Sequence, residues 1–133
     1  MLRALVIDDD KLIRWSLQEI FSQEGHQVDT VATVSEALAQ AEESLYHLIF
    51  ADMEIDNAVS TDMLRKLKKL QPKAEIIILS AQSLQDIEEQ VAELSISKII
   101  EKPFNSDQIR SIAKTALELF DKAHQGKNKT EEV

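Results

Sequence analysis

Short apolar runs alternate along the chain with longer stretches in which apolar residues recur at helical spacing. The first run, Leu2 to Ile7, is broken only by Arg3, and its length and β-branched content predict a buried strand. Apolar residues at helical spacing then follow at Ile13, Leu17, Ile20 and Phe21. Gly25 comes where a helix commonly ends, so the pattern predicts a strand followed by a helix.

The same strand–helix pattern recurs four more times. Strand-like runs cover residues 26–32, 46–51, 74–79 and 96–100. Helical stretches follow them, with expected first turns near Thr33, Met63, Ser83 and Asn105. The last stretch keeps an apolar face as far as Phe120, and the segment 124–133 is polar. We therefore expect one domain over residues 1–123 and a disordered tail over residues 124–133.

Five strand–helix units predict an α/β fold whose parallel strands are covered by helices on both faces. Right-handed crossovers turn such a chain into a doubly wound three-layer (βα)5 sandwich of the flavodoxin-like type. We expect a parallel five-stranded sheet with strand order 2-1-3-4-5. The direction of winding then changes between the first and third strands, which is where a ligand site is expected.

Composition narrows the classes of function. The chain has 133 residues with 15 Lys and Arg against 24 Asp and Glu, a formal net charge of −9. A surface this acidic is a poor match for a phosphate backbone, so we expect no direct nucleic-acid contact. The absence of cysteine excludes disulfides and thiol chemistry. No apolar run approaches the roughly 20 residues of a membrane span and no signal peptide is evident, so we expect a cytoplasmic protein without membrane contact.

Polar residues with chemical potential collect at the ends of the predicted strands. The first strand is followed by Asp8 and Asp9, the third by Asp52, the fourth by Ser80, and the fifth by Lys102. Three converging carboxylates repel one another unless a cation balances them, and Mg²⁺ prefers oxygen ligands. A carboxylate nucleophile, a metal ion and a lysine around one centre are the parts that phosphoryl transfer needs.

Four short stretches resemble the signatures of one family: Val6–Asp10, Ile49–Asp52, Ile78–Ala81 and Glu101–Phe104. Their order and spacing match across nearly the whole chain, which is similar to the response regulator receiver domains of bacterial two-component systems. Each stretch alone is a weak signal. All four together, in register with five strand–helix units, are specific.

The resemblance implies a role for each matching residue. Asp52 would accept a phosphoryl group from a histidine kinase or phosphotransfer protein. Asp9 and Asp52 would bind Mg²⁺ directly, with Asp8 close by or acting through water, and the backbone carbonyl of Glu54 would be a further ligand. The chain would catalyse its own phosphorylation and dephosphorylation, and would not be an enzyme that acts on a separate substrate.

The resemblance also implies how a signal would leave the site. Ser80 would be the switch hydroxyl and Lys102 the cation that pairs with the phosphoryl group, and the Lys102–Pro103 bond would be cis. The fourth helix, fifth strand and fifth helix would form the responding face. We expect that face to bind a partner, including a second copy of the chain in a homodimer.

Two departures from the family pattern affect this interpretation. In the loop Met53–Ser60, Asp56 stands where receivers usually have proline and Ser60 where they usually have glycine. We therefore expect a more mobile loop with added negative charge. Ile99 stands where receivers carry an aromatic switch residue, and an aliphatic side chain cannot swing as an amphipathic ring does.

Alternative functions follow from the same features. A pseudo-receiver, a protein-binding module that is never phosphorylated, is favoured by the unusual loop and by Ile99. A flavin-binding, flavodoxin-like domain is disfavoured, because Asp8, Asp9 and Asp10 repel phosphate unless a metal ion is present. A Mg²⁺-dependent phosphohydrolase is disfavoured, because the chain has no room for a cap or further catalytic residues. The segment Leu12–Leu17 resembles receivers attached to enhancer-binding activators, so the chain is either a stand-alone receiver or part of a longer regulator. Within that segment we expect Trp15 to be half-buried.

Overall fold

The computed structural model describes the backbone of residues 1–56 and 58–131. The strands are β1 (Arg3–Ile7), β2 (Gln27–Val31), β3 (Leu48–Asp52), β4 (Glu54–Ile55), β5 (Ala58–Val59), β6 (Glu75–Ser80) and β7 (Lys98–Glu101). The helices are α1 (Lys11–Gln23), α2 (Val34–Glu43), α3 (Thr61–Leu70), α4 (Leu84–Val91) and α5 (Ser106–Glu131).

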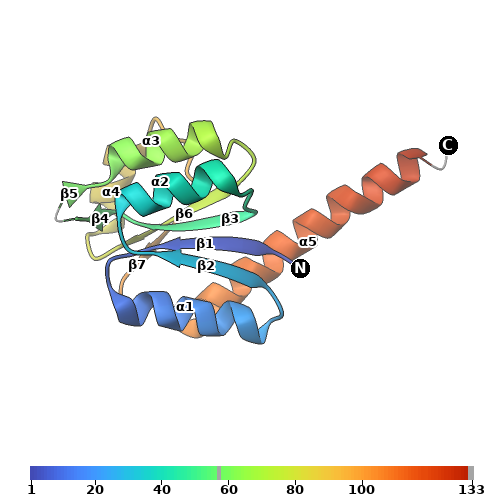
Figure 1. Cartoon of the computed structure of the whole chain (residues 1–133), viewed down its shortest axis with the longest axis horizontal. Coiled ribbons are helices and arrows are strands. Elements are labelled where there is room, and N and C mark those ends of the chain that lie inside the picture. Colours follow the sequence, from blue (N-terminus) through green and yellow to red (C-terminus); the bar gives the residue numbers. More distant parts are fainter. Residues whose placement is uncertain (57, 132–133) are drawn as a thin grey trace.

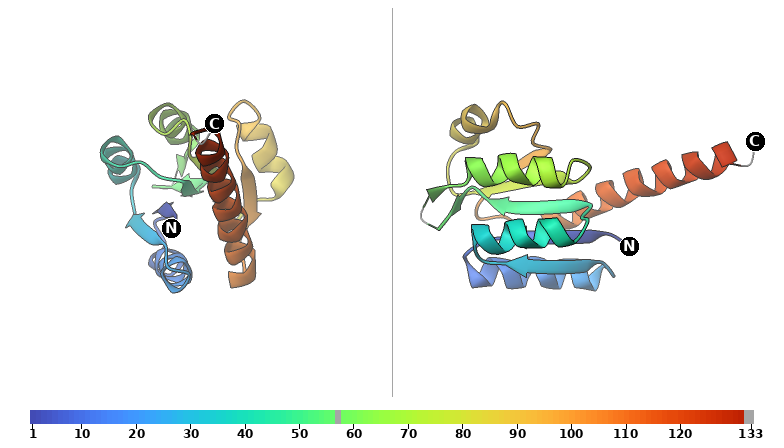
Figure 2. Two further views of the ribbon diagram at one scale, coloured as in Figure 1. Left: turned by 90° about the vertical axis from the view of Figure 1, so that its right-hand side faces the viewer. Right: turned by 45° about the horizontal axis from the view of Figure 1, so that its top comes forward.

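The main sheet is parallel and has five strands in the order β2-β1-β3-β6-β7. With the short β4–β5 hairpin set aside, this is the predicted order 2-1-3-4-5, so the predicted fold class is confirmed. Helices α1 and α5 cover one face of the sheet, and α2, α3 and α4 cover the other (Figures 1 and 2). Winding changes direction between β1 and β3, which lie side by side.

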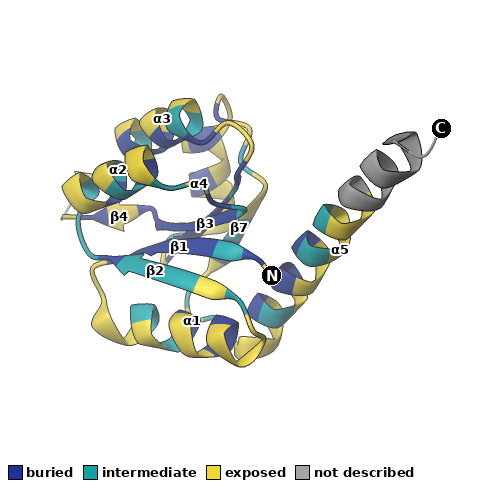
Figure 3. Cartoon of the chain, turned by 45° about the vertical axis from the view of Figure 1, so that its right-hand side comes forward, coloured by how far each residue is buried: buried dark blue, intermediate teal, exposed yellow. Residues whose placement is uncertain are grey.

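The core lies on both faces of the sheet because successive side chains of a strand point to opposite faces. In β1, Leu5 and Ile7 join the cluster under α2, α3 and α4, whereas Ala4 and Val6 join the cluster under α1 and α5. Every residue of β3 is buried, so this central strand is covered on both faces, and Asp52 at its end is its one charged residue (Figure 3). Burying one large aliphatic or aromatic side chain contributes about 1.5–3 kcal/mol, and these layers fix the strand ends that carry the site.

Side-chain caps begin α1, α2, α4 and α5, and those of α2, α4 and α5 lie where the sequence predicts the first turns. Asp10 accepts the backbone N–H of Leu12 at the start of α1, and Ser83 accepts that of Asp86 at the start of α4. The corresponding caps of α2 and α5 are Thr33, which accepts from Glu36, and Asn105, which accepts from Gln108. These caps satisfy backbone donors that a helix leaves unpaired and set where each helix leaves the sheet.

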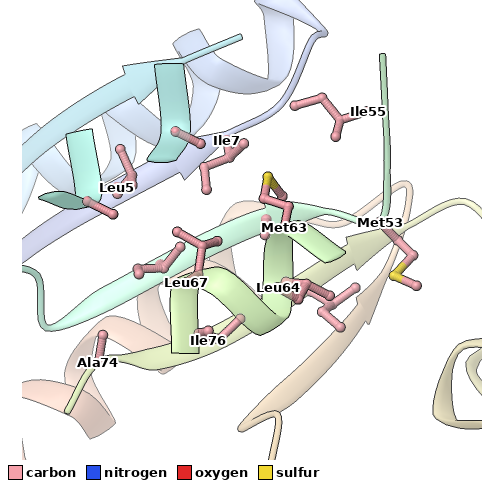
Figure 4. Close-up of a cluster of buried hydrophobic side chains, with 14 of the residues drawn as sticks. Leu5, Ile7, Met53, Ile55, Met63, Leu64, Leu67, Ala74 and Ile76 are labelled. Carbon is pink, nitrogen blue, oxygen red and sulfur yellow. The ribbon is translucent and has the colours of Figure 1, made fainter. Parts of the chain in front are cut away.

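The loop after β3 is a short hairpin, which the pattern of apolar residues does not predict. Strands β4 and β5 pair antiparallel, with Glu54 opposite Val59. Asp56, at the turn, has a φ of 55°, a left-handed conformation that Asp tolerates better than most residues. The side chains of Met53 and Ile55 are 0% and 1% exposed and anchor the hairpin in the core (Figure 4).

Helix α5 continues past the globular body, and its backbone runs to Glu131 (Figure 1). The backbone of residues 124–131 therefore lies in a helix, while residues 132–133 lie outside the described part. The domain limit at residue 123 and the disorder of residues 124–133 in solution stay predictions. No helix among residues 1–56 and 58–131 is long and apolar enough to cross a membrane.

Candidate functional site

Three carboxylates meet at the carboxyl ends of β1 and β3. Carboxylate oxygens of Asp8, Asp9 and Asp52 all lie within 4.8 Å of one another. Asp8 and Asp52 are 0% and 5% exposed, and Asp9 is exposed at the rim. The site is therefore an acidic pocket at the point where the winding of the sheet changes direction, as the sequence predicts.

Lys102 enters this pocket from the loop after β7. Its Nζ lies 3.0 Å from Asp8 Oδ2 and 3.4 Å from Asp52 Oδ1. The backbone N–H of Lys102 donates to the carbonyl of Ser80 at 2.7 Å, which holds this loop against the end of β6. The Lys102–Pro103 peptide bond is cis, as the resemblance implies. Burial acts to lower the pKa of Lys102, but the close contact with Asp8 and the charges of Asp8 and Asp52 outweigh burial, so the pKa is raised.

Two donors contact the Asp52 carboxylate, and its pKa lies closer to 7 than that of an ordinary aspartate. The backbone N–H of Glu54 donates to Asp52 Oδ1 at 3.1 Å, and the Lys102 contact falls on the same oxygen. Burial, then the negative charge of Asp8, raises the pKa of Asp52 from 3.8 to about 6, although the Glu54 N–H and Lys102 act in the opposite direction. The carboxylate is thus mostly ionised at pH 7, and its second oxygen is left for another ligand.

Ser80 lies at the end of β6 and is 1% exposed. Its Oγ accepts the backbone N–H of Gln82 at 3.0 Å. None of the described residues accepts a hydrogen bond from this hydroxyl. The hydroxyl can therefore donate to a group bound in the pocket.

The donor set fits a hard divalent cation. Asp8 Oδ2 is buried and makes no hydrogen bond within the described residues, although the Lys102 ammonium lies 3.0 Å away. One lysine does not neutralise three carboxylates, and oxygen ligands suit Mg²⁺ or Ca²⁺. The acidic pocket of Asp8, Asp9 and Asp52 could therefore hold a metal ion.

Other contacts at the site have no clear signal in the sequence. The Arg14 guanidinium donates to the carbonyl of Asp8 at 2.8 Å and ties α1 to the end of β1. The side chain of Glu54, whose carbonyl is an expected metal ligand, instead accepts from Gln82 Nε2 at 2.9 Å. The Ser60 hydroxyl donates to the backbone carbonyls of Asp52 and Met53. Ser60 is the exception, because the sequence marks this position as unusual: the similar family usually has glycine there.

The fold and the pocket define the class of the protein as a parallel α/β sandwich whose acidic pocket, at the switch point of the sheet, could hold a metal ion. Comparison with known families places the chain more narrowly, because the response regulator receiver domain model matches residues 4–114. The chain belongs to the response regulator receiver domain family. It is a signalling module of two-component systems.

Individual relatives agree with this assignment. The chain is 30% identical over 117 residues to sporulation initiation phosphotransferase F of Bacillus subtilis, covering 88% of this chain and 94% of that protein. It is 29% identical over 113 residues to the DNA-binding transcriptional regulator NtrC of Azospirillum brasilense, covering 85% of this chain and 24% of that protein. A CheY-like receiver domain protein of Methanospirillum hungatei superposes with a TM-score of 0.81 at 27% identity, over 92% of this chain and 98% of that one.

Proposed function

We propose that the chain is a phosphorylation-dependent switch in which Asp52 accepts a phosphoryl group. The observation that carries the proposal is the meeting of Asp52 with Asp8, Asp9 and Lys102 in one small pocket. Response regulators interact with histidine kinases or phosphotransfer proteins, and we propose such a protein as the donor. The name of the Bacillus subtilis relative, a phosphotransferase, supports this choice.

In the proposed reaction, a carboxylate oxygen of Asp52 forms a bond to phosphorus while the P–N bond of a phosphohistidine breaks. The electron pair of that bond returns to the imidazole nitrogen of the donor, which then takes a proton. Lys102 would pair with the oxygens of the incoming group, and Ser80 would donate its hydroxyl hydrogen to one of them. Asp52 is held by the Glu54 N–H, so little reorientation precedes attack.

The proposed metal ion is Mg²⁺, held by Asp9 and Asp52 with Asp8 and the carbonyl of Glu54 nearby. When bound, it supplies positive charge that offsets the carboxylates and stabilises the phosphoryl oxygens. The cluster of three carboxylates supports this assignment, because Lys102 is the one cation that contacts the carboxylates of Asp8 and Asp52 within the described residues, and it balances only one of the negative charges.

The test of the proposed function is intact-mass spectrometry after incubation with acetyl phosphate and Mg²⁺. We expect the wild type to gain one phosphoryl group and Asp52→Asn to gain none. Asp62→Asn, which removes an exposed carboxylate on α3, is the matched control and should be modified like the wild type. A wild type of unchanged mass would contradict phosphorylation and favour the pseudo-receiver, the alternative suggested by Ile99 and the unusual loop.

We expect Asp9→Ala to abolish Mg²⁺ binding within the millimolar range. Asp9 is the exposed member of the cluster, so its removal takes away a ligand while Asp8 and Asp52 keep their contacts with Lys102. Isothermal calorimetry of the wild type and the variant measures this directly, with Asp62→Ala as the control. Unchanged binding in Asp9→Ala would show that the ion lies elsewhere.

We expect phosphorylation to alter the face formed by α4, β7 and α5, and this face to bind a partner, including a second copy of the chain. Ser80 begins the loop into α4, so drawing its hydroxyl toward a phosphoryl group would pull that loop. Glu101, beside Lys102, also accepts the backbone N–H of Leu84 at 3.0 Å and links β7 to the start of α4. This link does not depend on an aromatic residue at position 99.

Sedimentation and hydrogen exchange, with and without beryllofluoride as a phosphoryl mimic, test this route. We expect slower exchange and stronger self-association when the mimic is bound, and no change in Asp52→Asn. The face carries mixed charges, including Glu88, Glu89, Lys98 and Arg110, that could pair across a two-fold axis. Bound beryllofluoride with unchanged exchange over residues 81–110 would rule this route out.

A further inference from the structure

We infer that Ser60 is a positioning residue for Asp52, because its hydroxyl holds the main chain that aims a backbone N–H at the Asp52 carboxylate. The inference rests on the proposed role of Asp52 as phosphoacceptor. Ser60 is 4% exposed and occupies the N-cap position of α3, yet its side chain makes no capping hydrogen bond. Its hydroxyl is bonded within the site instead.

The hydroxyl contacts two consecutive backbone carbonyls, that of Asp52 and that of the next residue, Met53. Ser60 Oγ lies 2.9 Å from the carbonyl oxygen of Asp52 and 2.9 Å from that of Met53. The single hydroxyl hydrogen is therefore shared between the two acceptors. The backbone N–H of Ser60 also donates to the Met53 carbonyl, at 2.8 Å. Ser60 thus closes the base of the β4–β5 hairpin onto the end of β3.

These bonds orient the Asp52 carboxylate indirectly, through the rigid geometry of a trans peptide group. The C=O and N–H of one peptide group point in opposite directions in one plane. Ser60 holds the Met53 carbonyl, and the N–H of that same peptide group, on Glu54, donates to Asp52 Oδ1 at 3.1 Å. The preceding peptide group is held too, because its carbonyl binds Ser60 and its N–H, on Met53, donates to the Leu79 carbonyl at 2.9 Å.

The consequence is a carboxylate held in one orientation before the donor arrives. The fixed N–H occupies one oxygen of Asp52, so the other is presented to the incoming phosphorus. Loss of the Ser60 hydroxyl leaves the Met53 carbonyl with the Ser60 N–H alone and the Asp52 carbonyl without this donor, which loosens the Met53–Glu54 peptide group and weakens that hold. We expect the phosphorylation rate to fall about 5- to 10-fold, as for the loss of one positioning hydrogen bond.

The experiment compares Ser60→Ala with Ser60→Thr, which keeps a hydroxyl. Tyr46→Phe is the control, because it removes a buried hydroxyl that donates to Asp29 at 2.6 Å, far from the site. The readouts are the acetyl phosphate reaction rate at saturating Mg²⁺ and the amide proton shift of Glu54 in the metal-free protein. We expect Ser60→Ala to be slow with its Glu54 amide moved upfield, Ser60→Thr to recover both, and Tyr46→Phe to change neither.

Two results would overturn the inference: a wild-type rate in Ser60→Ala, or a slow Ser60→Ala whose Glu54 amide has not moved. Should Ser60→Ala not fold, Ser60→Gly removes the same hydroxyl and carries the same expectations. Failure of the proposed function appears separately, as a wild type that takes no phosphoryl group. The amide shift then decides alone whether Ser60 aims the N–H at Asp52.

Discussion

Replacing Lys102 with methionine is expected to lower the free energy of unfolding by about 2–4 kcal/mol at pH 7.5 in chelator. Methionine keeps the length and apolar stem of the side chain and removes its charge. Asp8 and Asp52, both buried, then lose the cation that lies 3.0 and 3.4 Å from their oxygens. Uptake of a proton by Asp52, whose pKa is already raised to about 6, limits the cost.

Urea denaturation followed by circular dichroism measures this loss, and Lys98→Met on the exposed side of β7 is the control. We expect the control to stay within about 0.5 kcal/mol of the wild type. The double variant Lys102→Met with Asp52→Asn should recover part of the loss, because fewer buried charges remain unpaired. Mg²⁺ should stabilise Lys102→Met more than the wild type, since the ion no longer competes with the ammonium. Equal stability of Lys102→Met and the wild type in chelator would show that the lysine contributes nothing to the free protein.

The parallel sheet is predictable from the sequence because each of its strands is an apolar run long enough to be recognised. Strand boundaries are less predictable. The third run begins at Tyr46, but β3 begins at Leu48, and the Tyr46 N–H donates to the side-chain oxygen Gln71 Oε1 and not to a neighbouring strand. The apolar pattern of a segment predicts that it is buried, but it does not predict which acceptor each backbone N–H will bind.

The β4–β5 hairpin escapes prediction for a similar reason. Each strand has two residues, which is too short for a periodic pattern. Trp15 shows the opposite error: expected to be half-buried, it is 59% exposed. It lies two residues before Leu17, or about 200° around the helix from the stripe that faces the sheet. The prediction of half-burial was wrong, because this position faces away from the sheet.

The candidate site is predictable to the extent that it depends on strand ends. Asp8, Asp52, Ser80 and Lys102 lie at the carboxyl ends of four of the five main strands, and a parallel sheet brings those ends together. The contacts that hold these side chains in place are not predictable from the sequence. Whether the Ser60 hydroxyl caps α3 or donates to the end of β3 depends on a rotamer and a hairpin, and neither leaves a pattern in spacing.

Asp52→Asn is expected to raise the free energy of unfolding by about 1–3 kcal/mol at pH 7.5 in chelator. The pKa of Asp52 is raised in the folded chain to about 6 from 3.8, because burial and the charge of Asp8 outweigh its bonds to Glu54 and Lys102. A raised carboxylate pKa means that the folded state binds the proton more tightly than the unfolded state. Ionised Asp52 therefore destabilises the fold above pH 6, and asparagine removes that penalty.

The sign of the effect fixes its pH dependence. The advantage of Asp52→Asn should be full above about pH 7, shrink as the pH falls through 6, and vanish below about 3.8, where Asp52 is protonated in both states. Thermal melts of both proteins from pH 5 to 8 in chelator measure it, with Asp62→Asn as a control that should show no such trend. Saturating Mg²⁺ should reduce or reverse the advantage, because a ligand stabilises the folded state that binds it more tightly. An advantage that grows toward pH 5 would mean that the Lys102 contact outweighs burial and that ionised Asp52 stabilises the free protein.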